Sequence, residues 1–74
     1  MFQIVTTKRT HKGGRITERK ELHVQSVLDY KDYLGVQMKL ALFENRGFVF
    51  LADTGAALPA MHYDDGTTVE VFHV

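Results

Sequence analysis

The sequence has no cysteine, no tryptophan and a single proline among its 74 residues. Without cysteine there can be neither a disulfide framework nor a thiolate metal site, so we expect a reducing location such as the cytoplasm. The apolar runs at residues 40–43 and 48–52 are too short to span a membrane, and the N-terminus lacks the layout of a signal peptide. A chain of this length predicts one domain, residues 1–74.

The chain also has no excess of positive or negative charge, because its net charge at pH 7 is zero. This balance is compatible with self-association or a stable complex. Residues 1–20 nevertheless hold six basic residues and one acid, a net of +5, whereas residues 21–74 hold three basic and eight acidic residues, a net of −5. Such asymmetry along a chain indicates charged partners.

The N-terminal third predicts a β-hairpin. Residues 2–10 are rich in β-branched side chains, and Gly13-Gly14 favours a two-residue type I′ turn into a return strand over residues 15–24. In that register Lys12 faces Arg15 and Lys8 faces Arg19. Because side chains alternate across a strand, these four cations would share one face, with Arg9 and Glu18 paired on the other.

We expect this hairpin to project from the domain as a basic arm, because Ile16 is the only apolar residue between residues 7 and 19. One interpretation is that the arm docks on nucleic-acid phosphates or on an acidic protein surface. The other is that it is a solvated hairpin without a partner. The candidate partner-binding residues are Lys8, Lys12, Arg15, Arg19, Arg9 and Lys20.

A helix should begin after Ser26, whose side chain is a good N-cap, with Asp29 in the first turn. We favour a short helix that ends at Gly35 in the left-handed conformation, followed by a strand over residues 36–43 whose apolar residues alternate. The alternative is a helix that continues through Gly35 to about Phe43, at a cost near ~1 kcal/mol for the internal glycine.

The C-terminal half predicts further strands. Residues 45–47 suggest a three-residue hairpin loop that leads into a strand over residues 48–53. Residues 54–65 suggest a loop closed by Asp65-Gly66, and residues 67–74 a final strand. The predicted fold is α+β in the order ββαβββ, with the helix packed on one face of a mostly antiparallel sheet.

The predicted strand at residues 48–53 is apolar on both faces, because Val49 and Leu51 alternate with Phe48 and Phe50. Such a strand needs cover on both sides, and one helix covers only one. Either the second face is a protein-binding or homodimer surface, or the 54–65 loop folds over it.

The segment Tyr63-Asp64-Asp65-Gly66-Thr67-Thr68-Val69-Glu70-Val71 resembles the entry into the last strand of ubiquitin-like β-grasp proteins, which also share the element order and approximate length. The chain ends Phe72-His73-Val74 instead of the Gly-Gly of the conjugating members, and the long Lys/Arg hairpin is not a family feature. The resemblance therefore implies a binding scaffold and not a conjugated tag.

The acidic residues form a second candidate surface, able to meet a basic partner or to imitate nucleic acid. They are Asp29, Asp32, Glu44, Asp53, Asp64 and Asp65. Compact, cysteine-free proteins with such charge partition look like small phage-encoded inhibitors, anti-CRISPR proteins among them. That resemblance implies a target in a host macromolecular complex and a location in the host cell cytoplasm.

Catalytic motifs are few. Asp53-Thr54-Gly55 resembles the motif of retroviral-type aspartic proteases, but only 19 residues follow it, too few for the remaining strands of that family, and we favour a strand end with an Asp/Gly turn. The four histidines lack metal-ligand spacing. We therefore expect no catalytic residue, metal or cofactor. The leading hypothesis is a non-enzymatic binding module; the alternatives are nucleic-acid binding through residues 7–20 and a small dimeric hydrolase that uses Asp53.

Overall fold

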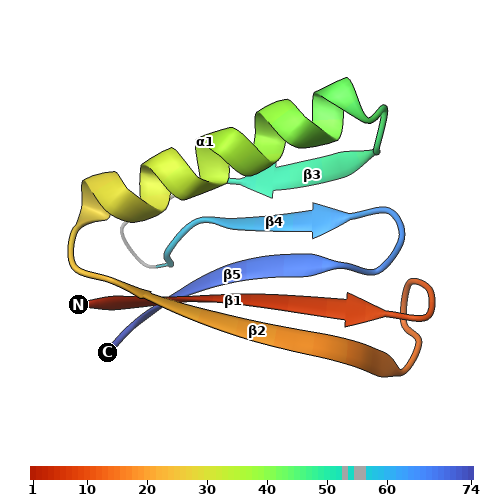
Figure 1. Cartoon of the computed structure of the whole chain (residues 1–74), viewed down its shortest axis with the longest axis horizontal. Coiled ribbons are helices and arrows are strands. Elements are labelled where there is room, and N and C mark those ends of the chain that lie inside the picture. Colours follow the sequence, from red (N-terminus) through yellow and green to blue (C-terminus); the bar gives the residue numbers. More distant parts are fainter. Residues whose placement is uncertain (53, 55–56) are drawn as a thin grey trace.

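The computed structural model describes residues 1–52, 54 and 57–74, and within these it has one helix and five strands. They follow the order ββαβββ, which confirms the predicted α+β fold (Figure 1). The elements are β1 (Phe2–Arg9), β2 (Ile16–Val24), α1 (Val27–Phe43), β3 (Phe48–Leu51), β4 (Ala60–Tyr63) and β5 (Thr68–His73).

The strands form one antiparallel sheet in the order β2-β1-β5-β4-β3. The first and last strands are neighbours near its centre, so the two termini lie together, and the Val74 amide donates to the Met1 carbonyl at 3.1 Å (Figure 1). Strands β2 and β3 are the two edges. In the described chain neither has a partner on its outer side.

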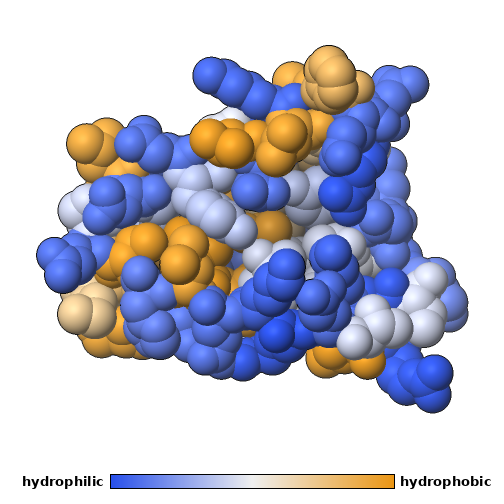
Figure 2. All heavy atoms as spheres, in the orientation of Figure 1, coloured by the Kyte–Doolittle hydropathy of each residue, from blue (hydrophilic) through white to orange (hydrophobic). Residues whose placement is uncertain are grey.

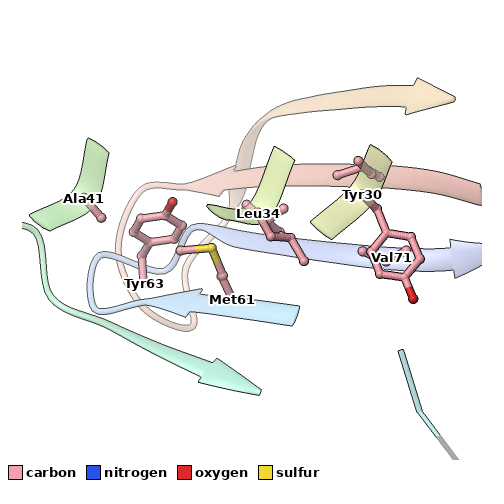
Figure 3. Close-up of a cluster of buried hydrophobic side chains, with 8 residues drawn as sticks. Tyr30, Leu34, Ala41, Met61, Tyr63 and Val71 are labelled. Carbon is pink, nitrogen blue, oxygen red and sulfur yellow. The ribbon is translucent and has the colours of Figure 1, made fainter. Parts of the chain in front are cut away.

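The core lies between α1 and the middle of the sheet. Tyr30, Leu34 and Ala41 share one helix face and point toward the strands, where they meet Met61 and Tyr63 among others (Figure 3). The cluster is completed by Ile4, Val69 and Val71. Full burial of each large apolar side chain contributes about 1.5–3 kcal/mol, which makes this seam the main source of stability.

The start of α1 confirms the predicted cap. The Ser26 side chain accepts a hydrogen bond from the Asp29 amide at 3.1 Å. The preferred prediction for the other end is wrong, because α1 continues through Gly35 to Phe43 and residues 36–43 form no strand. Burial of Leu34 and Ala41 on either side of Gly35 outweighs the ~1 kcal/mol cost of an internal glycine.

Residues 45–47 end the helix and do not form the predicted hairpin loop. Asn45 adopts a positive φ of 60°, the Arg46 amide donates to the Ala41 carbonyl at 2.8 Å, and the Asn45 amide donates to the Leu42 carbonyl at 3.2 Å. This is the hydrogen-bond pattern of a Schellman motif. Asn45, and not Gly47, therefore supplies the left-handed residue.

The predicted 54–65 loop contains a strand. Residues 60–63 form β4, which pairs beside β3, so the described residues of this segment do not fold over β3, and Val49 and Leu51 remain exposed. The Asp65-Gly66 turn is confirmed: Gly66 has a φ of +93°, and its amide donates to the Tyr63 carbonyl at 3.1 Å. The final strand is confirmed as β5.

Candidate binding surfaces

The first hairpin forms, but its register differs from the predicted one. Lys8 pairs with Glu18, Thr7 pairs with Arg19, and a bulge follows Lys8. The turn is centred one residue earlier than expected, because the Gly14 amide donates to the His11 carbonyl at 2.8 Å and only Gly13 has a positive φ. A one-residue shift of register moves a side chain to the other face of a sheet.

The shift contradicts the predicted face of four cations. Lys8 and Lys20 lie on the helix side of the sheet, and both contact Glu18, at 3.3 and 3.7 Å. Arg19 lies on the opposite side and pairs with Glu21, whose pKa this hydrogen bond and the positive charge of Arg19 hold below its usual value. The predicted Arg9–Glu18 pair is also absent, because Arg9 pairs with Ile16.

The hairpin tip lies against the body and does not project as a free arm. The Arg9 guanidinium donates to the Gly66 carbonyl at 3.2 Å. A Cβ on Gly66 would come within 2.5 Å of the His11 carbonyl oxygen, so the tip and the β4–β5 turn are in close contact. Lys12 and Arg15 are in the connecting loop and form no ion pair with any described residue.

A polar pocket of about 250 Å³ between α1 and the sheet does gather cations. Lys8 and Lys20 line it together with Arg46, which is not among the candidate residues predicted from the sequence. The Arg46 guanidinium stacks 4.2 Å from the centre of the Tyr63 ring and donates to Asp65 at 2.9 Å. Since all three cations lie within 4 Å of a carboxylate, the pocket presents little unpaired positive charge.

The acidic residues do not form one surface. Asp29 and Asp32 lie in the first turns of α1. Glu44 caps its other end, about 22 Å away for 15 residues of helix. There Glu44 and Asp65 both pair with Arg46, and the Asp64 amide donates to the Gly47 carbonyl at 3.0 Å. Asp53 is outside the described residues.

The outer side of α1 carries an apolar stripe within residues 36–43, for which the sequence pattern favours a strand. Val36, Leu40 and Phe43 follow the i, i+4, i+7 spacing of one helix face, and we call them the helix stripe. All three are exposed, and Phe43 has an exposed fraction of 90%. The alternation of apolar residues that favoured a strand over residues 36–43 is therefore not produced by one strand face. Its members, Val36, Met38, Leu40 and Leu42, lie on several sides of one helix.

A second apolar surface follows the free edge of the sheet. Val49, Phe50 and Leu51 of β3 have exposed fractions of 56%, 39% and 46%, and we call them the β3 edge. A pocket of about 390 Å³ separates Phe50 from Leu34 and Met38 of the helix. Figure 2 shows apolar side chains over α1 and β3 with polar ones between them, and a further apolar area lower on the same face, over the left ends of β4 and β5.

The described residues contain no cluster of histidine, aspartate and glutamate side chains suited to a metal ion. In the same part of the chain, no helix combines the length and the hydropathy that a membrane crossing requires. The Asp53-Thr54-Gly55 motif has two of its three residues outside the described part, so its proposed chemistry has no geometry to support it. Comparisons with protein-family models, with curated proteins and with solved structures found no match.

Proposed function

We propose that this protein is a non-enzymatic binding module that docks on a protein partner through the helix stripe. The observation that carries the proposal is the exposure of Phe43, which lies on the same helix face as the exposed aliphatic residues Val36 and Leu40. The last turn of α1, residues 40–43, is apolar on every side, which is typical of a buried helix, yet α1 is covered on one side only. Burial of the helix stripe by a partner would supply the missing cover.

The chemistry of the stripe fits a protein partner. Large aromatic side chains placed in a pocket of the partner dominate the energy of many interfaces, and neighbouring aliphatic residues exclude water around them. Helical ligands commonly present such anchors at i, i+4 and i+7 to a hydrophobic groove. Phe43 would be the anchor, with Leu40 and Val36 as its apolar surround.

The narrower form of the proposal is an inhibitor that occupies a surface of a host macromolecular complex, in the manner of small phage-encoded proteins. It is supported by the small size, the lack of cysteine and the charge partition along the sequence. We do not extend it to nucleic-acid binding, because that hypothesis required four cations on one face of the hairpin, and Lys8 and Arg19 lie on opposite faces.

The test is partner recovery with tagged protein from the cells in which the protein is naturally produced, quantified by mass spectrometry. We expect Phe43→Glu and Leu40→Glu to lose the proteins that the wild type recovers. Leu42→Glu is the matched control, because Leu42 is the neighbouring exposed residue on a different face of α1. Circular dichroism should show that all variants are folded. Equal recovery by the wild type and Phe43→Glu would contradict the proposal.

A further inference from the structure

The two edges of the sheet differ sharply in charge. Strand β2 carries Glu18, Arg19, Lys20 and Glu21 along its centre, and charged side chains of this kind prevent a sheet edge from pairing with another chain. Strand β3 reads Phe-Val-Phe-Leu and carries no charge. Its outer backbone groups have no partner in the described residues, which leaves β3 as the edge open to strand pairing.

We propose that a second copy of this chain pairs with β3, so that two antiparallel β3 strands join two five-stranded sheets into one. The site is the β3 edge, and its occupant is the β3 edge of the other copy. Antiparallel pairing of identical strands is two-fold symmetric, which closes the assembly at a dimer. The proposal rests on different residues from the helix stripe, so either can fail without the other.

The side chains of β3 complement themselves. Residues directly opposite in an antiparallel pair point to the same face, and the two registers that pair three residues of β3 with β3 place Val49 opposite Val49 or opposite Leu51 of the other copy. In both registers phenylalanine meets phenylalanine on the helix side, as Phe48 with Phe50 or Phe50 with Phe50. Aromatic and aliphatic pairs of this kind stabilise antiparallel strands, and no charge is buried in either register.

The whole molecule also permits the approach of a second copy. The net charge is zero, so two copies do not repel each other as highly charged proteins do. Helix α1 packs on the strands inside the edge, with the 390 Å³ pocket between it and Phe50. The outer side of β3 is therefore open to a pairing strand.

Light scattering coupled to size exclusion tests the proposal on the full chain. We expect a mass approaching twice the 8.4 kDa of one chain as the concentration rises over about a hundredfold range. Val49→Lys and Leu51→Lys should each weaken the dimer by at least about tenfold, because a lysine at an edge disfavours strand pairing. Leu22→Lys, on the β2 edge, should leave the dimer unchanged.

Cysteine cross-linking gives an independent readout, because the chain has no cysteine of its own. After mild oxidation we expect a disulfide-linked dimer from Val49→Cys, or from mixed Val49→Cys and Leu51→Cys chains, and none from Leu22→Cys. A wild type that stays monomeric at every concentration would overturn the proposal. So would a dimer that survives Val49→Lys, or assemblies that grow beyond two copies.

Discussion

At the scale of single residues, Arg46 organises the end of the molecule where helix, strand and turn meet. It follows the helix cap, stacks on Tyr63 and pairs with Asp65, whose carboxylate also accepts the Thr67 amide at 2.9 Å. The hydrogen bond from Thr67 is the main reason why the pKa of Asp65 lies below its usual value, and Arg46 adds to it. Desolvation acts on Tyr63 in the other direction and raises its pKa.

The lowered pKa of Asp65 predicts a pH dependence of stability. A carboxyl whose pKa is lower in the folded state stabilises the protein above its unfolded pKa, near pH ~4, and this contribution is lost as the pH falls through the folded pKa. Asp65→Asn should lower the free energy of unfolding at neutral pH by about 0.5–1 kcal/mol, a modest value because the side chain is exposed.

Urea unfolding of both proteins at neutral and acid pH measures this effect. The difference between wild type and Asp65→Asn should shrink as the medium becomes more acidic than about pH 4. A difference that is the same at all pH values would show that the variant acts through something other than the ionised carboxylate.

The sequence shows which residues of the first hairpin are basic, but it does not determine on which face of the sheet each of them lies. Gly13-Gly14 correctly marked a turn between two strands, yet the sequence pattern does not distinguish which of the two glycines has the positive φ. That choice, together with the bulge after Lys8, decides whether Lys8 faces Arg19 or Glu18. The predicted face of four cations depended on this single step of register, and the described structure does not contain it.

At the scale of elements, the helix shows where sequence patterns succeed and where they fail. The Ser26 cap, the strands of the first hairpin, the Asp65-Gly66 turn and the last strand follow from local chemistry that the structure preserves. The second half of α1 does not, because its exposed apolar residues imitate a strand. Sequence patterns are expected to mislead at functional sites, and the helix stripe is proposed as one. Strand β4 was missed because four residues after Pro59 give too short a pattern.

Gly35→Ala tests the length of the helix. A Cβ at this position would meet no atom within 4 Å, so the alanine variant should gain helix propensity at no steric cost. We expect the free energy of unfolding to rise by about 1 kcal/mol and the midpoint of thermal unfolding by roughly 4–8 °C. If Gly35 instead ended the helix in the left-handed conformation, the same substitution would destabilise the protein.

At the scale of the whole molecule, the hairpin tip contacts the β4–β5 turn, which lies at the same end of the sheet (Figure 1). Gly66 and Gly13 both have positive φ, but only a Cβ on Gly66 would strike the other segment, at the His11 backbone. Both alanine substitutions should therefore carry the backbone strain of about 1–2 kcal/mol. Gly66→Ala should also force the tip and the β4–β5 turn apart.

Chemical unfolding of the two glycine variants measures this contact. We expect Gly66→Ala to be less stable than Gly13→Ala by at least about 1 kcal/mol, since it disturbs packing as well as φ. Equal losses in the two variants would indicate that the tip is free, as the basic-arm hypothesis required.

Within the described residues, the molecule is a small sheet covered by one helix, and many of its large apolar side chains remain exposed. At both proposed surfaces, the helix stripe and the β3 edge, apolar side chains are exposed to solvent. A partner on the helix stripe and a second copy at the β3 edge would bury different parts of this apolar surface. The assembled protein would then be a two-fold dimer with one partner-binding helix on each copy.

A glutamate scan of the exposed helix positions, read out by partner recovery and by folding, tests the proposed function most directly. We predict that glutamate at Val36, Leu40 and Phe43 abolishes recovery while the circular dichroism spectrum is retained, and that glutamate at Leu28 and Leu42 has no effect on recovery. Recovery that is lost equally at all five positions, or at none of them, would contradict a docking surface on the helix stripe.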